Sequence, residues 1–264
     1  MENNVSAQNE ILNICNVGVT YSGDTDAIGG INLHIYEGEF ICVLGESGCG
    51  KSTLLKLLAG FLKPTEGSVF LRGKAVTDID WRRGVVFQNP PLFEWLSVKD
   101  NIAFGPKMRG IKKEVYRGLV DDYLKKMGLE QCADMKIFEL SGGMKQRVSI
   151  ARTLINDPEI LLMDEPFGAL DAITRENIQD LLRDIWGTAP KTVFFITHDV
   201  DEALLLGTRI IVMGDKPGRI LGDFEEDFSA RILLEKSSHI KYTDSFYKER
   251  EKMVALIHDN TTFA

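Results

Sequence analysis

The stretch Gly45-Glu46-Ser47-Gly48-Cys49-Gly50-Lys51-Ser52-Thr53 decides the fold of this chain. It matches the pattern G-x-x-x-x-G-K-[ST], and it lies between an apolar strand-like run, Phe40 to Leu44, and a helical pattern, Lys51 to Ala59. Glycines let successive backbone N–H groups curl around phosphate oxygens, and the following helix adds its positive end. Lys51 is expected to reach the β- and γ-phosphates of a nucleotide, and Ser52 to complete a magnesium ligand set. A plain glycine-rich turn is the alternative interpretation.

Two carboxylates follow a second apolar run. Ile160 to Met163 is typical of a buried strand, and Asp164 and Glu165 come directly after it. Buried carboxylates are costly unless they meet a cation, so a magnesium site is expected at this strand end. We expect Asp164 to hold the magnesium ion and Glu165 to act as general base toward an attacking water. Two solvated loop acids before Pro166 are the alternative.

The segments around these motifs predict an α/β fold with a mixed sheet. Asn13 to Tyr21 and Ala27 to Ile35 flank turn residues 22–24 and predict an antiparallel hairpin. A further strand pair is predicted over Ser68 to Arg72 and Gly84 to Gln88. Short apolar strands then alternate with helices, which implies a parallel sheet covered on both faces. These strands are Ile160 to Met163, Thr192 to Ile196 and Arg209 to Met213.

The region from about residue 89 to 156 is predicted to be an inserted helical subdomain. Helical spacing predicts one helix over Lys113 to Met127 and a second over Gly142 to Ile155. The apolar face predicted for the first helix comprises Leu119, Tyr123, Leu124 and Met127. One domain over residues 1–264 is therefore expected, with a core of 1–88 and 157–222 and a tail of 223–264. The tail is expected to hold one helix, near Ser245 to His258.

Composition and charge exclude several classes of protein. The 264 residues contain 31 Lys and Arg against 39 Asp and Glu, a net charge of −8, which argues against a nucleic-acid partner. No apolar run approaches the ~18 to 20 residues that a membrane span needs. The first ten residues lack the basic and apolar regions of a secretion signal. The four cysteines show neither paired metal-ligand spacing nor the density of a disulfide framework.

The octet Leu140-Ser141-Gly142-Gly143-Met144-Lys145-Gln146-Arg147 identifies the branch of P-loop proteins. Ser141 and the two glycines are placed to open a helix, which makes a second anion-binding helix end. The octet resembles the signature of ATP-binding cassette (ABC) ATPases, whose usual form has Gln where Met144 stands. In that family two subunits pack head to tail, and each signature caps the ATP of the other. The resemblance thus implies a homodimer in which Ser141, Gly142 and Gly143 contact the partner's nucleotide.

Further motifs extend the resemblance over roughly residues 13 to 215. Gln88 looks like the glutamine that joins the core to the helical subdomain and senses magnesium and water. Ala169-Leu170-Asp171 looks like the loop that crosses the dimer interface, so Asp171 is expected to contact the partner's ATP. His198 resembles the switch histidine that contacts the γ-phosphate and orients the water, although a structural histidine is the alternative. Tyr21 stands where the family places an aromatic that stacks on adenine, although an ordinary strand aromatic is the alternative.

The resemblance implies an α/β ABC ATPase fold, hydrolysis of ATP with Mg²⁺, and a place in a transporter. Short loop patterns are similar to those of ATPase subunits that serve importers of nitrate, taurine, alkylsulfonates and similar small solutes. The expected partners are a second copy of the chain, integral membrane permease subunits and, indirectly, an extracytoplasmic solute-binding protein. The expected location is peripheral, at the cytoplasmic face of the cell membrane.

An apolar cluster after Gln88 is a candidate contact surface for the membrane partner. It is expected either to pack the helical subdomain or to form a groove for a short helix of the permease, and it comprises Pro91, Leu92, Phe93, Trp95 and Leu96. The alternative function is a soluble ABC-type scaffold ATPase, such as those of iron–sulfur cluster assembly, with no membrane partner. A nucleic-acid ATPase of the ABC type is disfavoured by the acidic balance and the single cassette.

Overall fold

The computed structural model describes residues 9–21, 25–168, 170–188, 191–235 and 238–259. The chain divides into two units, one of Met1–Asp80 with Arg183–Ala264 and one of Trp81–Leu182. The boundary falls inside helix α5 (Ala172–Thr188). Within the described ranges, every helix is too short or too polar to cross a bilayer.

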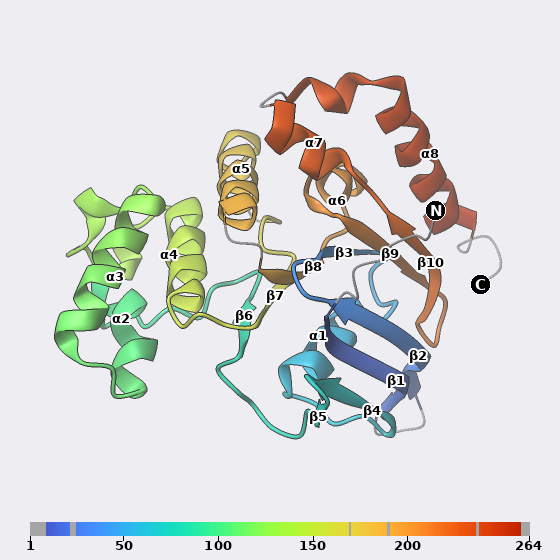
Figure 1. The fold of residues 1–264 in the computed structure, drawn as a ribbon, viewed down its shortest axis with the longest axis horizontal. Coiled ribbons are helices and arrows are strands. Elements are labelled where there is room, and N and C mark those ends of the chain that lie inside the picture. Colours follow the sequence, from blue (N-terminus) through green and yellow to red (C-terminus); the bar gives the residue numbers. More distant parts are fainter. Residues whose placement is uncertain (1–8, 22–24, 169, 189–190, 236–237, 260–264) are drawn as a thin grey trace, which may run out of the picture. The chain divides into compact units, whose positions relative to one another are not determined.

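The first unit begins with an antiparallel sheet in the strand order β2-β1-β4-β5 (Figure 1). Ile14 of β1 lies opposite Leu33 on one side and Val69 on the other, and all three side chains are buried. The predicted hairpin of β1 and β2 is confirmed, while its turn residues 22–24 lie outside the described residues. The bounds are β1 Glu10–Tyr21, β2 Thr25–Tyr36, β4 Glu66–Leu71 and β5 Lys74–Ala75.

The same unit holds the strands that carry the phosphate loop. Strand β3 (Phe40–Leu44) is wholly buried and pairs in parallel with β8 (Thr192–Ile196) and β9 (Arg209–Gly214). Strand β10 (Arg219–Glu225) pairs antiparallel with β9. The helices of this unit, besides the end of α5, are α1 Lys51–Ala59, α6 Val200–Leu206, α7 Phe228–Glu235, the 3₁₀ turn η3 Ser238–Tyr242 and α8 Asp244–Asp259. Helices α7 and α8 both pack on α6, and α8 also contacts β9.

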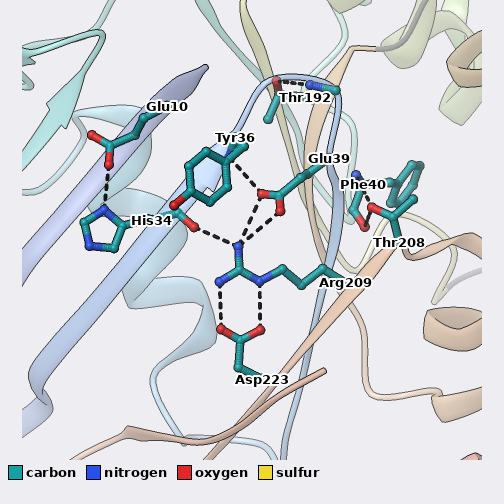
Figure 2. A network of polar contacts seen from close by, with 10 residues as sticks. Glu10, His34, Tyr36, Glu39, Phe40, Thr192, Thr208, Arg209 and Asp223 are labelled. Atoms are coloured by element: carbon teal, nitrogen blue, oxygen red, sulfur yellow. Dashed lines mark hydrogen bonds and ion pairs between the residues drawn. The ribbon is translucent and has the colours of Figure 1, made fainter. Parts of the chain in front are cut away.

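One arginine links the two sheets of this unit (Figure 2). The Arg209 guanidinium donates two bonds of 2.7 Å to the Asp223 carboxylate and one of 2.8 Å to the His34 carbonyl oxygen. It also donates to Glu39 at 3.2 and 3.3 Å. Such a bidentate contact is geometrically specific, and the bonds that Arg209 donates to Asp223 raise the pKa of the guanidinium. Arg209 therefore joins β2, the start of β3 and β10.

The second unit consists of a parallel strand pair and a group of helices. Strand β6 (Arg83–Val86) pairs with β7 (Ile160–Asp164). Helix α2 packs against both α3 and α4 (Figure 1). The Ser97 side chain caps α2 by accepting a bond from the Asp100 N–H. The helical elements are α2 Val98–Met108, α3 Lys113–Lys126, η1 Glu130–Cys132, η2 Ile137–Glu139, α4 Gly142–Leu154 and the start of α5.

Most predicted elements are confirmed, but two predictions are wrong. The strand predicted over Gly84 to Gln88 does not pair with the one over Ser68 to Arg72, because β6 pairs in parallel with β7 while β4 pairs with β1 and β5. The apolar face predicted for α3 is wrong at Leu119, which is 38% exposed, although Leu124 and Met127 are buried as predicted. The buried positions of α3 are Tyr116, Val120 and Leu124, at a spacing of four. Helices α2 and α7 and strand β10 were not predicted.

Candidate nucleotide-binding and catalytic residues

The phosphate loop follows β3 and has a backbone that only glycine accommodates at two positions. Gly45 has φ +152°, and a Cβ there would lie 2.2 Å from the Met213 carbonyl oxygen. Gly50 has φ +93°, and a Cβ there would lie 2.2 Å from Cγ2 of Ile28. Both distances are too short for real atoms, so the tight path of the loop requires these glycines. The predicted helix after the loop is confirmed, because α1 begins at Lys51.

Lys51 is buried at the centre of the loop. Its Nζ donates to the carbonyl oxygens of Gly45 at 2.7 Å and Glu46 at 2.8 Å. Throughout the part of the chain that the structure describes, no carboxylate forms an ion pair with this ammonium. Two neutral carbonyls balance a buried positive charge less well than an anion does. The site therefore fits a phosphate group.

The remaining loop residues divide into exposed and covered positions. Glu46, Ser47 and Gly48 are exposed, which leaves their backbone accessible. Cys49 is buried, and its burial raises the pKa of the thiol. Ser52 and Thr53 are half-buried in the first turn of α1. This first turn is where a phosphate loop places its magnesium-binding hydroxyl.

Tyr21 lies beside the phosphate loop, as the resemblance implies. Its hydroxyl is 3.2 Å from Oγ1 of Thr53, and the residue is 42% exposed. An exposed aromatic ring next to the loop has a face available for stacking. The hydrogen bond ties the end of β1 to α1.

His198 lies at the same sheet edge as the loop. Val43 of β3 pairs with Ile196 of β8, so Gly45 and His198 each lie two residues beyond a paired position. Gly45, Glu46 and His198 line one cavity of about 540 Å³. The structure thus brings the predicted switch histidine to the phosphate loop.

Helix α8 forms the other wall of this cavity, which the sequence did not predict. Helix α8 contributes Arg250, Val254, Ile257 and His258 to its lining. Nε of Arg250 lies 2.7 Å from Oδ1 of Asp201, in the first turn of α6. The helical periodicity of the tail predicted α8, but this periodicity does not indicate which face of the helix lines the cavity beside the phosphate loop.

In the second unit, Gln88 and Glu165 lie at one strand end. Val86 of β6 pairs with Met163 of β7, and each of the two residues follows its strand at the same register. Glu165 has φ +42°, which is uncommon for a residue with a Cβ, and its carbonyl accepts a bond from the Gly168 N–H at 3.3 Å. A Cβ on Gly168 would lie 3.0 Å from Nε2 of Gln88. The register therefore places Gln88 beside the end of β7, where Asp164 is the last strand residue and Glu165 follows it.

Ser141, Gly142 and Gly143 open helix α4 as predicted. The Ser141 hydroxyl oxygen accepts a bond from the Met144 N–H at 3.3 Å. Ser141 and Gly142 are exposed, and a Cβ on Gly142 would meet no atom within 4 Å. Gly143 is buried, and a Cβ there would lie 2.4 Å from Cγ2 of Thr174. The two glycines therefore differ, because only Gly143 is required by packing.

Asp171 caps helix α5. Its Oδ1 accepts a bond from the Thr174 N–H at 3.0 Å, and this bond lowers the pKa of the carboxyl. Asp171 is exposed, so it remains accessible to a second chain. Ala169 of the same predicted loop lies outside the described residues.

The oxygen donors available for a magnesium ion are few. In the described ranges, no group of three or more His, Cys, Asp or Glu is arranged to hold a metal ion alone. Mg²⁺ is commonly held by one or two protein groups together with substrate phosphates. Ser52 offers a hydroxyl and Asp164 a carboxylate, which are oxygen donors of the kind that Mg²⁺ takes when a nucleotide supplies further ligands.

An α/β fold with a phosphate loop, a buried loop lysine and an acidic strand end defines the class of P-loop nucleotide-hydrolysing proteins. The ABC transporter family profile matches residues 28–168. The taurine import ATP-binding protein TauB of Ruegeria pomeroyi is 44% identical over 252 residues, 94% of each chain. The chain belongs to the ABC transporter family.

Solved structures agree with this assignment. The cbiO1 protein of Clostridium perfringens, part of the cbiONQ complex, has a TM-score of 0.77 at 31% identity and covers 93% of this chain and 99% of its own. The ATP-binding cassette MJ0796, in a dimeric post-hydrolysis state with ADP and Pi, has a TM-score of 0.73 at 35% identity, covering 81% and 98%. The chain therefore has the α/β ABC ATPase fold, and it is an ATPase that uses ATP and Mg²⁺.

Proposed function

We propose that this chain is the ATP-hydrolysing subunit that energises an importer of a small solute, namely nitrate, taurine, an alkylsulfonate or a similar organic anion. Taurine is the first candidate, because similarity to taurine import proteins extends over 94% of the chain. That observation carries the proposal. It also favours a transporter subunit over a soluble scaffold ATPase.

We assign the nucleotide contacts as follows. Tyr21 stacks on adenine, the backbone N–H groups of residues 45–50 bind phosphate oxygens, and Lys51 binds the β- and γ-phosphates. Ser52, Gln88 and Asp164 hold Mg²⁺, which neutralises charge on the phosphate oxygens when bound. The geometry that supports this assignment is the glycine-dependent loop and the buried Lys51 ammonium without an ion-pair partner in the described part of the chain.

Hydrolysis is assigned to Glu165, His198 and a second copy of the chain. Glu165 takes a proton from the attacking water as general base, while His198 and Gln88 orient that water. The second copy closes the site head to tail with Ser141, Gly142, Gly143 and Asp171. The exposed positions of Ser141, Gly142 and Asp171, at the starts of α4 and α5, support this role.

The second unit carries a surface suited to a membrane partner. Trp95 is 71% exposed, and its ring lies 5.2 Å from that of Phe93, which in turn lies 4.4 Å from Phe104. Arg152 lies over the Phe93 ring at 5.4 Å. We assign this surface, within the helical subdomain of residues 89–156, to a short helix of a permease at the cytoplasmic face of the membrane. A solute-binding protein then delivers the solute to the permease.

Uptake of radiolabelled taurine by the source cells tests the proposal. Deletion of the gene should abolish uptake, a plasmid copy should restore it, and a Lys51→Ala copy should not. Proline uptake serves as the control and should be unchanged. Wild-type taurine uptake in the deletion strain would refute taurine as the solute. Recovery of only soluble partners with the tagged chain would favour the scaffold alternative.

A further inference from the structure

The residues on either side of His198 are bonded to each other. Thr197 follows β8 and is 2% exposed, and its hydroxyl oxygen accepts a bond from the Asp199 N–H at 3.0 Å. This bond closes a short turn whose middle residue is His198. The backbone that carries the imidazole is therefore fixed from both sides.

The Thr197 hydroxyl also donates a hydrogen bond, so it forms one link of a chain. Its proton points to Oε2 of Glu202 at 2.6 Å, and Glu202 is 6% exposed. Oδ1 of Asp199 in turn accepts bonds from the N–H groups of Asp201 at 2.9 Å and Glu202 at 3.2 Å. In an ordinary capping box the third helical residue accepts the N-cap amide directly. Here the Thr197 hydroxyl stands between the Asp199 amide and the Glu202 carboxylate.

This arrangement costs more free energy than an ordinary helix cap. Glu202 holds a carboxylate in a nearly inaccessible place, where desolvation disfavours its charge. The half-buried Asp199 side chain already caps the start of α6, so the helix does not need a buried carboxylate for its cap. The buried Thr197–Glu202 bond adds a fixed connection between the end of β8 and the first turn of α6, and His198 lies in the chain between these two points. Groups that orient a reacting water must be held to within roughly 0.5 Å, and such precision comes from bonded supporting residues.

We infer that Thr197 and Glu202 are positioning residues for His198: their buried hydrogen bond sets the backbone from which the imidazole reaches toward the phosphate loop. The inference rests on the proposed role of His198 in hydrolysis. Neither residue lines the cavity that His198 shares with Gly45, so both act through the histidine rather than on the nucleotide.

The test compares Thr197→Val with Thr197→Ser in the full-length chain. Valine keeps the volume but removes the hydroxyl, whereas serine keeps the hydroxyl and both of its bonds. We expect Thr197→Val to lower kcat for ATP by about 10- to 100-fold with little change in KM. Thr197→Ser should restore kcat to within about threefold of wild type. A merely structural role would lower thermal stability without separating kcat from KM.

Three outcomes decide the inference. Wild-type kcat in a folded Thr197→Val variant overturns it. If Thr197→Val does not fold, Glu202→Gln and Glu202→Ala decide instead, because only Gln keeps an acceptor for the hydroxyl; equal kcat values for the two overturn the inference. His198→Ala distinguishes the proposed role of His198 in hydrolysis from the positioning role of Thr197 and Glu202. If that variant hydrolyses ATP normally, the proposed role of His198 fails; if it is inactive while Thr197→Val is fully active, only the positioning inference fails.

Discussion

The Lys51 ammonium lies 2.7 Å from the carbonyl oxygen of Gly45, the residue that opens its own loop. The lysine is thus held where a phosphate group would meet it, by neutral partners that an anion can replace. Removing the amine should therefore weaken the binding of ATP, and not only the rate of its hydrolysis.

Lys51→Ala should raise the Kd for ATP by at least about tenfold, because a charge-assisted contact to phosphate is lost. Titration with a fluorescent ATP analogue measures this. Lys56→Ala is the matched control, since it removes the same charge from an exposed position of the same helix. Equal affinities in the two variants would contradict the role of Lys51.

Glu165→Gln should leave ATP binding intact and lower kcat by at least about 100-fold, because an amide cannot accept the proton of the attacking water. Phosphate release measures turnover. Size-exclusion chromatography with ATP should show a trapped dimer. Glu130→Gln, at an exposed position, should behave as wild type. Near-normal turnover in the Glu165 variant would exclude this residue as the general base.

Gly143→Ala should destabilise the chain by about 1–3 kcal/mol, because its Cβ would meet Cγ2 of Thr174 at 2.4 Å. Gly142→Ala is the matched control and should change stability by less than about 1 kcal/mol, since its Cβ meets nothing. Urea unfolding of both variants measures the difference. Thr174→Ser removes the contacting methyl group and should rescue Gly143→Ala. Equal unfolding midpoints for the two alanine variants would refute the packing argument.

Glu226 should make stability fall as pH rises from about 4.5 to about 7. Desolvation, with repulsion from Glu249 second, raises the pKa of this carboxyl to about 7. In that pH range the folded chain binds more protons at this site than the unfolded chain, so protonation favours folding. We expect Glu226→Gln to flatten the fall, by about 1–2 kcal/mol, when urea unfolding is followed between pH 5 and 8. A parallel pH dependence in the wild type and the variant would show that other groups cause it.

The motifs and the buried strands were predictable because their signals are local. The phosphate loop requires Gly45 and Gly50 for backbone reasons that any strand–loop–helix context reveals, and β3 is apolar throughout. Which strand pairs with which is not determined by the local sequence. The strand at Gly84 carries the same signal whether it pairs with β4 or with β7, and only the assembled unit selects β7.

Other features could not be predicted because the local sequence pattern was compatible with more than one structure. Helix α3 has more apolar positions than packing covers, and Tyr116 and Val120 are buried whereas Leu119 is exposed. Helix α2 contains Pro106, a residue that argues against helix in isolation. The wall that α8 gives to the cavity near His198 depends on tertiary packing, which no periodicity encodes.

The Arg209 guanidinium has a consequence for how this unit comes apart. It bonds the His34 carbonyl of β2, the Glu39 carboxylate ahead of β3, and Asp223 of β10, so neither sheet can lose its edge without breaking bonds to the other. Fraying of the antiparallel sheet is therefore linked energetically to the strand that ends at the phosphate loop. The amides of β2 and β3 should exchange with deuterium in a single cooperative opening, and bound ATP should protect both strands together.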